Sequence, residues 1–309
     1  MIKHAWTVEH AHGGLRADFA VSQQLALPRN RVAKAIKDGA LNRNGKSIKP
    51  HHLLKEGDAL VYDEALVEKE AAAETPAALK ILFENDDVLV IDKPSGLLAH
   101  PTQASKSEAT VASLAQAHAK EIAKAGGESG REGLVHRLDR DVSGVMAIAK
   151  TPRMFALLKA QFADRTIEKE YLALVYGKLQ KDIGTISFNI ARSRGKGRMV
   201  ARPTSQEGRE AVTTYEVLER YVTATYVSVH IETGRTHQIR AHFKGIGYPI
   251  VGDSLYRKSY MKNIRPIALG RPFLHSHRLT FTLPDGTKKT VASPLPKELA
   301  ALRKKLPPL

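Results

Sequence analysis

The chain has no cysteine, so none of its 309 residues can form a disulfide or supply a thiolate to a metal. This absence fits a reducing compartment. No apolar run approaches the roughly 18–20 residues that a membrane-spanning helix needs, and residues 1–6 do not resemble a secretory signal. We therefore expect a soluble cytoplasmic protein. The glycines form no phosphate-binding loop of the Walker or dinucleotide type, so we expect no nucleotide cofactor.

Acidic residues are scarce relative to basic ones, since 32 Asp and Glu against 48 Lys and Arg leave a formal net charge of +16. Such a surplus favours a polyanionic partner, because each cation placed on a phosphate releases counterions. A basic protein without such a partner is the alternative. No basic amphipathic helix carries a broad apolar face, so the charge indicates nucleic acid rather than a membrane.

Charge also divides the chain into three zones. We predict a small basic domain over residues 13–62, an acidic, alanine-rich linker over 63–78 and a large basic domain over 79–309. In the large domain, helical spacing over 109–124 and 153–162 alternates with short apolar strand patterns. The predicted fold class is therefore mixed α+β, with a largely antiparallel sheet and flanking helices.

In the first zone, the sequence predicts two helices followed by a hairpin that turns at Asn44-Gly45. Cationic residues fall on all three elements. This arrangement resembles the S4 RNA-binding domain over about fifty residues. It departs from the S4 pattern at Ala17, where leucine is usual. A basic helical lid without RNA contact is the alternative. The resemblance implies RNA contacts by Arg16, Arg29, Arg31, Lys34, Lys37, Arg43 and Lys46.

The stretch 133–144 (GLVHRLDRDVSG) places two acids, two arginines and a histidine between apolar residues and ends on an expected Ser143-Gly144 turn. A carboxylate among guanidinium groups stays ionised, which suits a nucleophile or a base facing an anionic substrate. A solvated loop of salt bridges between two strands would show the same composition. The stretch alone leaves both interpretations open.

Further motifs follow in a fixed order: KEYLA at 169–173, GRTHQIR at 234–240, Gly252-Asp253 and LHSH at 274–277. Together with His136-Arg137-Leu138-Asp139, they make the chain from about residue 80 onward resemble the RluA-type pseudouridine synthases. An N-terminal S4 domain is also common in that family. No single motif would suffice, but the ordered set is specific.

The resemblance implies a role for each of four residues. Asp139 is the expected catalytic aspartate, which attacks the target uridine while uracil detaches from C1′ and reattaches through C5. Tyr171 is expected to lie against the base and Arg240 to pair with the aspartate. Arg137 is expected to enter the RNA stack as the nucleotide flips out, which the chemistry requires.

Other ionisable residues receive structural assignments. Asp141 is expected to pair with a neighbouring arginine. His275 and His277 could share a strand face, yet no cysteine and no third ligand accompany them, so we expect no metal. His136, His237 and His242 are expected to form hydrogen bonds or to face RNA.

We therefore expect a cofactor-free, metal-free RNA isomerase that converts uridine to pseudouridine in structured RNA, acting as a monomer. Family analogy favours large-subunit ribosomal RNA as the substrate, and transfer RNA is the alternative. Two other classes stay open: a non-catalytic RNA-binding or ribosome-assembly protein that keeps the fold, and a magnesium-dependent nuclease. The nuclease would need convergent carboxylates, which Asp139 and Asp141, flanked by arginines, supply poorly.

Overall fold

The structure is a computed structural model that describes residues 3–25, 27, 32–33, 35–36, 39–63, 78–102, 108–193, 198–256 and 267–309. The chain divides into two compact units, Met1–Ala77 and Ala78–Leu309. Their boundary falls inside the range 63–78 that the sequence predicts as a linker. Four residues predicted to contact RNA lie outside the described residues: Arg29, Arg31, Lys34 and Lys37.

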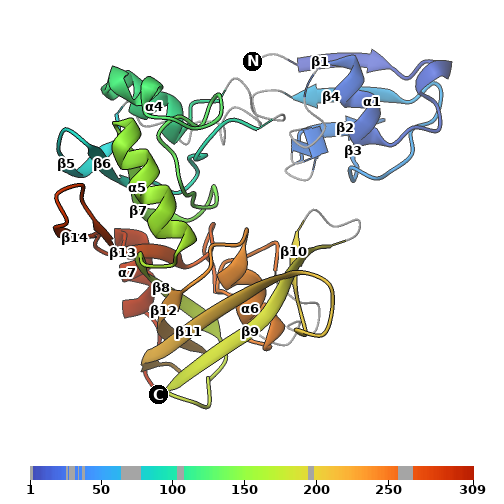
Figure 1. Ribbon diagram of the computed structural model, residues 1–309. Coiled ribbons are helices and arrows are strands. Elements are labelled where there is room, and N and C mark those ends of the chain that lie inside the picture. The colour runs from blue at the N-terminus through green and yellow to red at the C-terminus, as the bar shows by residue number, and fades with distance from the viewer. Residues whose placement is uncertain are drawn as a thin grey trace. The chain divides into compact units, whose positions relative to one another are not determined.

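A small antiparallel sheet organises the first unit (Figure 1). Its strands, in spatial order, are β1 (Lys3–Thr7), β4 (Ala59–Asp63), β2 (Leu41–Arg43) and β3 (Lys46–Ser47). The 3-10 helix η1 (His10–His12) and helix α1 (Ala17–Gln24) precede the hairpin. Asn44 and Gly45 both have positive φ, 51° and 76°, as a two-residue hairpin turn requires, so the predicted turn is confirmed.

One ten-stranded sheet organises the second unit and has the order β10-β9-β11-β12-β8-β13-β7-β6-β5, with β14 paired to β13. Among its described strand pairs, only β13 and β7 run parallel. The predicted mixed α+β class with a largely antiparallel sheet is confirmed. The strands are β5 (Lys80–Glu84), β6 (Val88–Lys93), β7 (Ser143–Ala149), β8 (Glu168–Tyr176), β9 (Ile183–Arg192), β10 (Met199–Arg202), β11 (Arg209–Arg220), β12 (Ala224–Ile231), β13 (Leu274–Thr282) and β14 (Lys288–Ala292).

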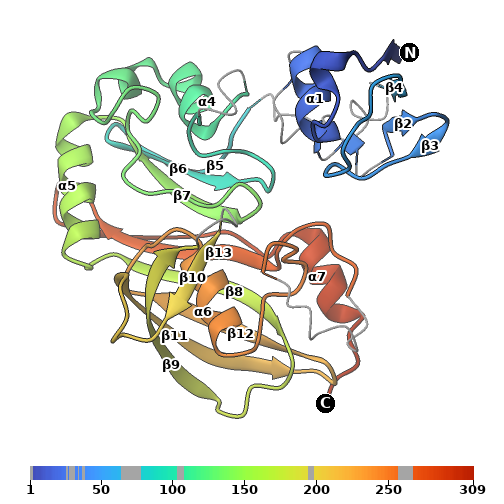
Figure 2. The ribbon, with the colours of Figure 1, turned by 90° about the vertical axis from the view of Figure 1, so that its right-hand side faces the viewer.

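Helices flank this sheet. Helix α5 (Pro152–Ala163) confirms the helix predicted over 153–162 and packs on β7 and β13. Helix α6 (Gln238–Gly245) packs on β9, β10 and β11 (Figure 2), and α7 (Lys297–Lys304) lies near the C-terminus. No described helix is long and apolar enough to cross a membrane.

The single helix predicted over 109–124 is wrong. Helix α4 (Val111–His118) ends early, because Ala119 takes an extended conformation with φ −135° and ψ 103°. The 3-10 helix η2 (Lys120–Lys124) then follows and buries Ile122. Helical spacing continues through residue 119, so the sequence carried no local signal for the break.

The predicted Ser143-Gly144 turn is also wrong, since these residues begin β7 and pair in parallel with His275 and Ser276 of β13. Gly144 has φ 119°, and a Cβ there would lie 2.1 Å from the Ser276 carbonyl oxygen. Only glycine permits so close an approach. The glycine therefore serves strand pairing and brings the 134–142 loop to the middle of the sheet.

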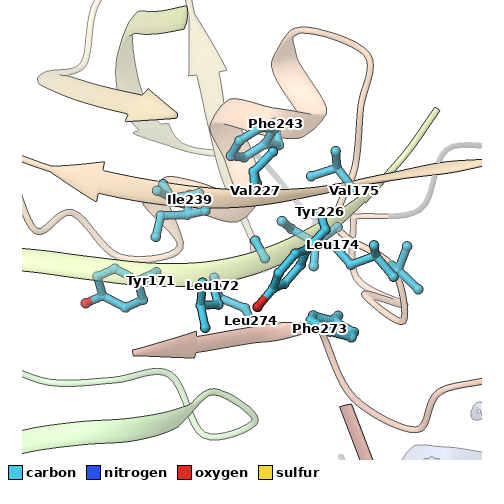
Figure 3. Close-up of a cluster of buried hydrophobic side chains, with 14 of the residues drawn as sticks. Tyr171, Leu172, Leu174, Val175, Tyr226, Val227, Ile239, Phe243, Phe273 and Leu274 are labelled. Carbon is cyan, nitrogen blue, oxygen red and sulfur yellow. The ribbon is translucent and has the colours of Figure 1, made fainter. Parts of the chain in front are cut away.

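The largest core cluster of the second unit lies around β8, β12 and α6, with Phe243 and Phe273 fully buried (Figure 3). Tyr171 lies at one end of this cluster, and Ile239 of α6 lies nearby (Figure 3). Elements that carry candidate site residues therefore also form the core, which fixes their positions.

Two buried histidines, His242 and His275, and the half-buried His136 make stability depend on pH. Burial lowers the pKa of His136, His242 and His275 to about 4, against an ordinary 6.5. The unfolded chain therefore takes up these protons below pH 6.5, while the folded chain takes them up only near pH 4. The free energy of unfolding should fall as pH falls from 6.5 towards 4, by up to about 1.4 kcal/mol per pH unit for each histidine.

Urea denaturation at pH 7, 6 and 5 measures this fall, in a window above the ordinary range of exposed carboxylates. His242→Leu should reduce the slope, because one of the histidines with a lowered pKa no longer titrates. A free energy of unfolding that stays constant from pH 7 to pH 5 would contradict the prediction.

Candidate active site

The loop that carries Asp139 is held by a fully buried lysine. Lys93, at the end of β6, donates from Nζ to three carbonyl oxygens within 3.0 Å, those of Pro94, Leu97 and Arg140. Burial lowers the pKa of Lys93 to about 7. The Gly96 amide also donates to the Arg140 carbonyl, at 2.9 Å. These bonds join residues 93–97 to the backbone next to Asp139.

Asp92 and Lys93, neighbouring charged residues at the end of β6, have separate roles. Asp92 accepts from Lys80 at 2.8 Å on the neighbouring strand, while Lys93 points into the interior. The anchoring function of Lys93 was not predicted from the sequence. The Asp92-Lys93 pair directly after four apolar strand residues was the available signal.

Arg240 joins two carboxylates. Its Nη1 donates to Oδ2 of Asp139 at 2.9 Å, while Nε and Nη2 donate to Asp253 at 2.6 and 2.9 Å. Arg240 and Asp253 are both buried, with residue exposures of 6% and 3%. Burial lowers the pKa of Arg240, but the hydrogen bonds and charges of Asp253 and Asp139 outweigh it and raise that pKa above its ordinary value.

The planar geometry of the Arg240 guanidinium fixes the direction in which it faces Asp139. A guanidinium bound along one edge by Asp253 has a single orientation, so its remaining nitrogen points at Asp139. The side chain of Asp139 is 16% exposed against 1% for Asp253. One carboxylate therefore anchors the arginine, and the other is presented to the cavity. The sequence motif Gly252-Asp253 carried no assigned role.

Two adjoining cavities open around Asp139. The larger, of about 290 Å³, is lined by Arg140, Asp141, Asp253 and Arg271 among others. The smaller, of about 80 Å³, is lined by Leu138, Val142, Tyr171, Ile231 and Leu274 among others. Both are lined by Arg137, Asp139, His237 and Arg240. The four residues predicted for catalysis and substrate binding are thus brought together.

Tyr171 forms an apolar wall of the smaller cavity. It lies on β8 and is 8% exposed. Burial raises its pKa to about 12, although the Ser276 hydroxyl partly opposes this rise. The phenol is therefore neutral at physiological pH and presents a flat ring beside Asp139.

Arg137 is held at the cavity by His100. The Nη1 atom of Arg137 lies 3.0 Å from Nε2 of His100, whose Nδ1 lies 2.9 Å from the Pro101 carbonyl oxygen. Since the carbonyl can only accept, Nδ1 carries the proton and Nε2 accepts from the guanidinium. Burial lowers the pKa of His100, consistent with this neutral form.

His237 lies at the N-terminus of α6 with φ 55° and ψ 23°, a left-handed conformation. Its Nε2 is 3.7 Å from Oδ2 of Asp139, and its Nδ1 is 3.1 Å from the Tyr256 hydroxyl. The helix begins at Gln238, directly after this left-handed residue. From the sequence, only a hydrogen-bonding or RNA-facing function was predicted for His237.

Several candidate residues have other partners. Arg140 pairs with Glu108 at 2.8 Å, while the Asp141 carbonyl accepts from Ser95 and the Asp141 residue lines the larger cavity. His275 and His277 both lie close to the Ser293 carbonyl oxygen, at 3.2 and 2.7 Å. Over the described residues, no cluster of three or more His, Asp or Glu has the arrangement of a metal site.

In the first unit, some of the described residues that were predicted to contact RNA pair with acidic side chains. Arg16 forms a two-point pair with Asp18, at 3.0 and 2.9 Å, and its side chain stays 48% exposed. Arg43 lies 3.5 Å from Asp58, and Lys46 is exposed on β3. Arg16 and Lys46 thus remain accessible to a partner.

Comparison with known proteins decides the family. The model of the RNA pseudouridylate synthase family matches residues 87–244, which include Arg137, Asp139, Tyr171 and Arg240. The chain belongs to the RNA pseudouridine synthase family. Membership makes it an isomerase, as the ordered motifs indicated.

Curated pseudouridine synthases match along nearly the whole chain. An uncharacterized RNA pseudouridine synthase of Synechocystis is 36% identical over 95% of this chain and 91% of its own length. Ribosomal large subunit pseudouridine synthase D of Pseudomonas aeruginosa is 36% identical over 96% and 94%. Among solved structures, human RNA pseudouridylate synthase domain containing 1 is 25% identical, with a TM-score of 0.59 over 75% of this chain and 89% of that chain.

The two carboxylates that share Arg240 should differ sharply in their effect on stability. Asp253→Asn removes the buried partner of a buried arginine, so it should lower the free energy of unfolding by about 3–5 kcal/mol. Asp139→Asn changes the partner that faces the cavity and keeps an oxygen that can accept from Arg240, so it should lower that free energy by less than Asp253→Asn does. Urea denaturation of both variants at pH 7 compares them, and the reverse ranking would contradict the anchoring role of Asp253.

Proposed function

We propose that this pseudouridine synthase isomerises one or more specific uridines in large-subunit ribosomal RNA, with Asp139 as the nucleophile. One observation supports the mechanism above all. The Asp139 carboxylate is held by Arg240, itself fixed by Asp253, at the point where two cavities meet. A carboxylate is a competent covalent nucleophile when it is ionised and oriented in this way.

Asp139 attacks C1′ of the target uridine while the C1′–N1 glycosidic bond breaks, and C5 of the released uracil then bonds to C1′ as the bond to Asp139 breaks. The Arg240 guanidinium stabilises the carboxylate before the attack and when it leaves again. Tyr171 offers its ring to the extruded base, because a neutral aromatic face stacks on any base without reading its edge.

Arg137 assists extrusion of the nucleotide. It lines both cavities, and its hydrogen bond to a neutral His100 can be exchanged for contacts with RNA. Unstacking a base costs a few kcal/mol, and a cation that enters the vacated stack offsets part of that cost. The protein needs no cofactor or metal for these steps.

The substrate assignment rests on the relatives and on charge. Relatives from Pseudomonas aeruginosa and Nitrosomonas europaea, 36% and 34% identical, are named ribosomal large subunit pseudouridine synthase D. The net charge of +16 favours a large polyanion. The first unit acts as an S4-type module that adds RNA affinity through Arg16, Arg43 and Lys46. The protein works as a monomer in the cytoplasm, where this substrate is made.

The site geometry disfavours the other classes. A non-catalytic RNA-binding protein would have no use for an arginine buried between two carboxylates beside a cavity, since such a buried network is costly to maintain. A nuclease would direct its carboxylates at one metal ion, whereas Asp139 and Asp253 both accept hydrogen bonds from Arg240. Transfer RNA remains the alternative substrate, and the assay below includes it.

Asp139→Asn should abolish pseudouridine formation, with a fall in rate of more than about 10³-fold, because an amide is not a nucleophile here. Purified protein is incubated with large-subunit rRNA and, separately, with tRNA that both lack the modification, and pseudouridine is mapped by position. Asp164→Asn, an exposed carboxylate at the end of α5, serves as the matched control and should leave the rate unchanged.

The rRNA should be modified at discrete positions and the tRNA should not. If the Asp139→Asn protein formed as much pseudouridine as the wild type, this result would contradict the assignment of Asp139 as the nucleophile. Modification of tRNA alone would replace the substrate assignment while leaving the mechanism intact.

A further inference from the structure

His237 is held in a left-handed conformation that a residue with a β-carbon rarely adopts. The side chain of the next residue fixes it there. Gln238 Oε1 accepts from the Thr233 hydroxyl at 2.8 Å and from the Arg235 amide at 3.0 Å, and Gln238 Nε2 donates to the Val212 carbonyl at 2.9 Å. Backbone strain maintained by such a network is typical of functional sites.

The hydrogen bonds of the Tyr256 hydroxyl define the tautomer of His237. The buried Tyr256 hydroxyl donates its single proton to the Met199 carbonyl at 3.0 Å and accepts from the Met199 amide at 3.1 Å. It therefore has no proton left for His237 Nδ1, which lies 3.1 Å away. Nδ1 must donate to the hydroxyl oxygen, so the neutral ring carries its lone pair on Nε2.

That lone pair points towards the reacting centre. Nε2 is 3.7 Å from Oδ2 of Asp139, which already accepts from Arg240, and His237 lines both cavities. Two acceptors at this distance do not bond each other directly, so the space beside them suits a group that gives up a proton. Burial lowers the pKa of His237, so the ring is neutral at pH 7 despite the nearby Asp139.

We propose that Nε2 of His237 is the base that removes the proton from C5 of the target uracil. When C5 has bonded to C1′, it carries both the sugar and its hydrogen, and the ring has a C6=N1 double bond. The C5–H bond then breaks and its proton goes to Nε2. Its electron pair forms C5=C6, the electrons of C6=N1 move to N1, and N1 takes a proton from the imidazolium or from water.

Five other ionisable groups around the cavities are poorly suited to this step. Arg137 and Arg240 are cations, and Tyr171 is a neutral acid with a raised pKa. Asp253 is occupied by Arg240, and Asp141 lines only the larger cavity. His237 is a neutral base beside Asp139. Because C5 bonds to C1′ at the place where Asp139 acts, the C5 hydrogen comes close to Nε2 of His237. The inference rests on the proposed function, since it assigns one proton transfer within that reaction.

His237→Asn tests the assignment. Asparagine tolerates the left-handed backbone, and its amide nitrogen can replace Nδ1 as the donor to Tyr256, while nothing replaces Nε2. Single-turnover rates are measured on RNA that carries uridine or 5-deuteriouridine at the target. We expect a fall of at least about 100-fold and a primary isotope effect larger than that of the wild type, because loss of the C5 proton becomes rate-limiting.

Two further variants sharpen the test. His237→Gly keeps the backbone conformation and opens space for added imidazole, which should restore a measurable part of the lost rate. His230→Asn, an exposed histidine on β12, is the matched control and should keep the wild-type rate. A merely structural role for His237 would give neither the isotope effect nor the imidazole rescue, and their joint absence would overturn the proposal.

The outcomes separate this inference from the function on which it rests. A wild-type protein that forms no pseudouridine on rRNA or tRNA contradicts the proposed function. An active wild-type protein whose His237→Asn variant is equally fast contradicts the role of His237 alone.

Discussion

The arginine shared between two carboxylates is the interaction on which the active site depends. Arg240 is bound along one edge by buried Asp253, and only this bidentate contact leaves its Nη1 directed at Asp139. A buried guanidinium with a single carboxylate would have unsatisfied donors and a free choice of orientation. Asp253 compensates the charge of the guanidinium inside the protein, while Asp139 accepts a further hydrogen bond from it and is still exposed to the cavity.

The surrounding fold serves to bring these three residues together from distant parts of the sequence. Asp139 comes from a loop before β7, which Lys93 ties to the end of β6 through the Arg140 carbonyl. Arg240 comes from α6, whose apolar side packs on the sheet, and Asp253 from the segment that follows it. Gly144 allows the close parallel pairing that places the loop mid-sheet. A shift in any of these would lengthen the contacts with Asp139.

Elements that depend on a few neighbouring residues were predicted correctly from the sequence. The Asn44-Gly45 turn and helix α5 follow from residue preferences over a few positions, and both appear as expected. The order of the family motifs predicted that Asp139, Tyr171 and Arg240 lie close together. The structure places the three around adjoining cavities. In each case the information lies in the residues themselves or in their order.

What the sequence did not reveal depends on long-range contacts. The break at Ala119 interrupts a helical pattern that looks continuous along the chain, and the strand start at Ser143 replaces an expected turn. The anchoring of Lys93 requires the carbonyl of Arg140, 47 residues away. The tautomer of His237 depends on a hydroxyl 19 residues away whose own proton is already used. None of these partners can be identified before the chain is folded.

The most direct measurement compares pseudouridine maps of ribosomal RNA from cells that contain this protein and cells that lack it. If Asp139 drives isomerisation of large-subunit RNA, cells without the protein lose pseudouridine at one or a few positions. Wild-type protein supplied back restores those positions, and the Asp139→Asn protein does not. Identical maps with and without the protein, or full restoration by Asp139→Asn, would contradict the proposed function and its mechanism.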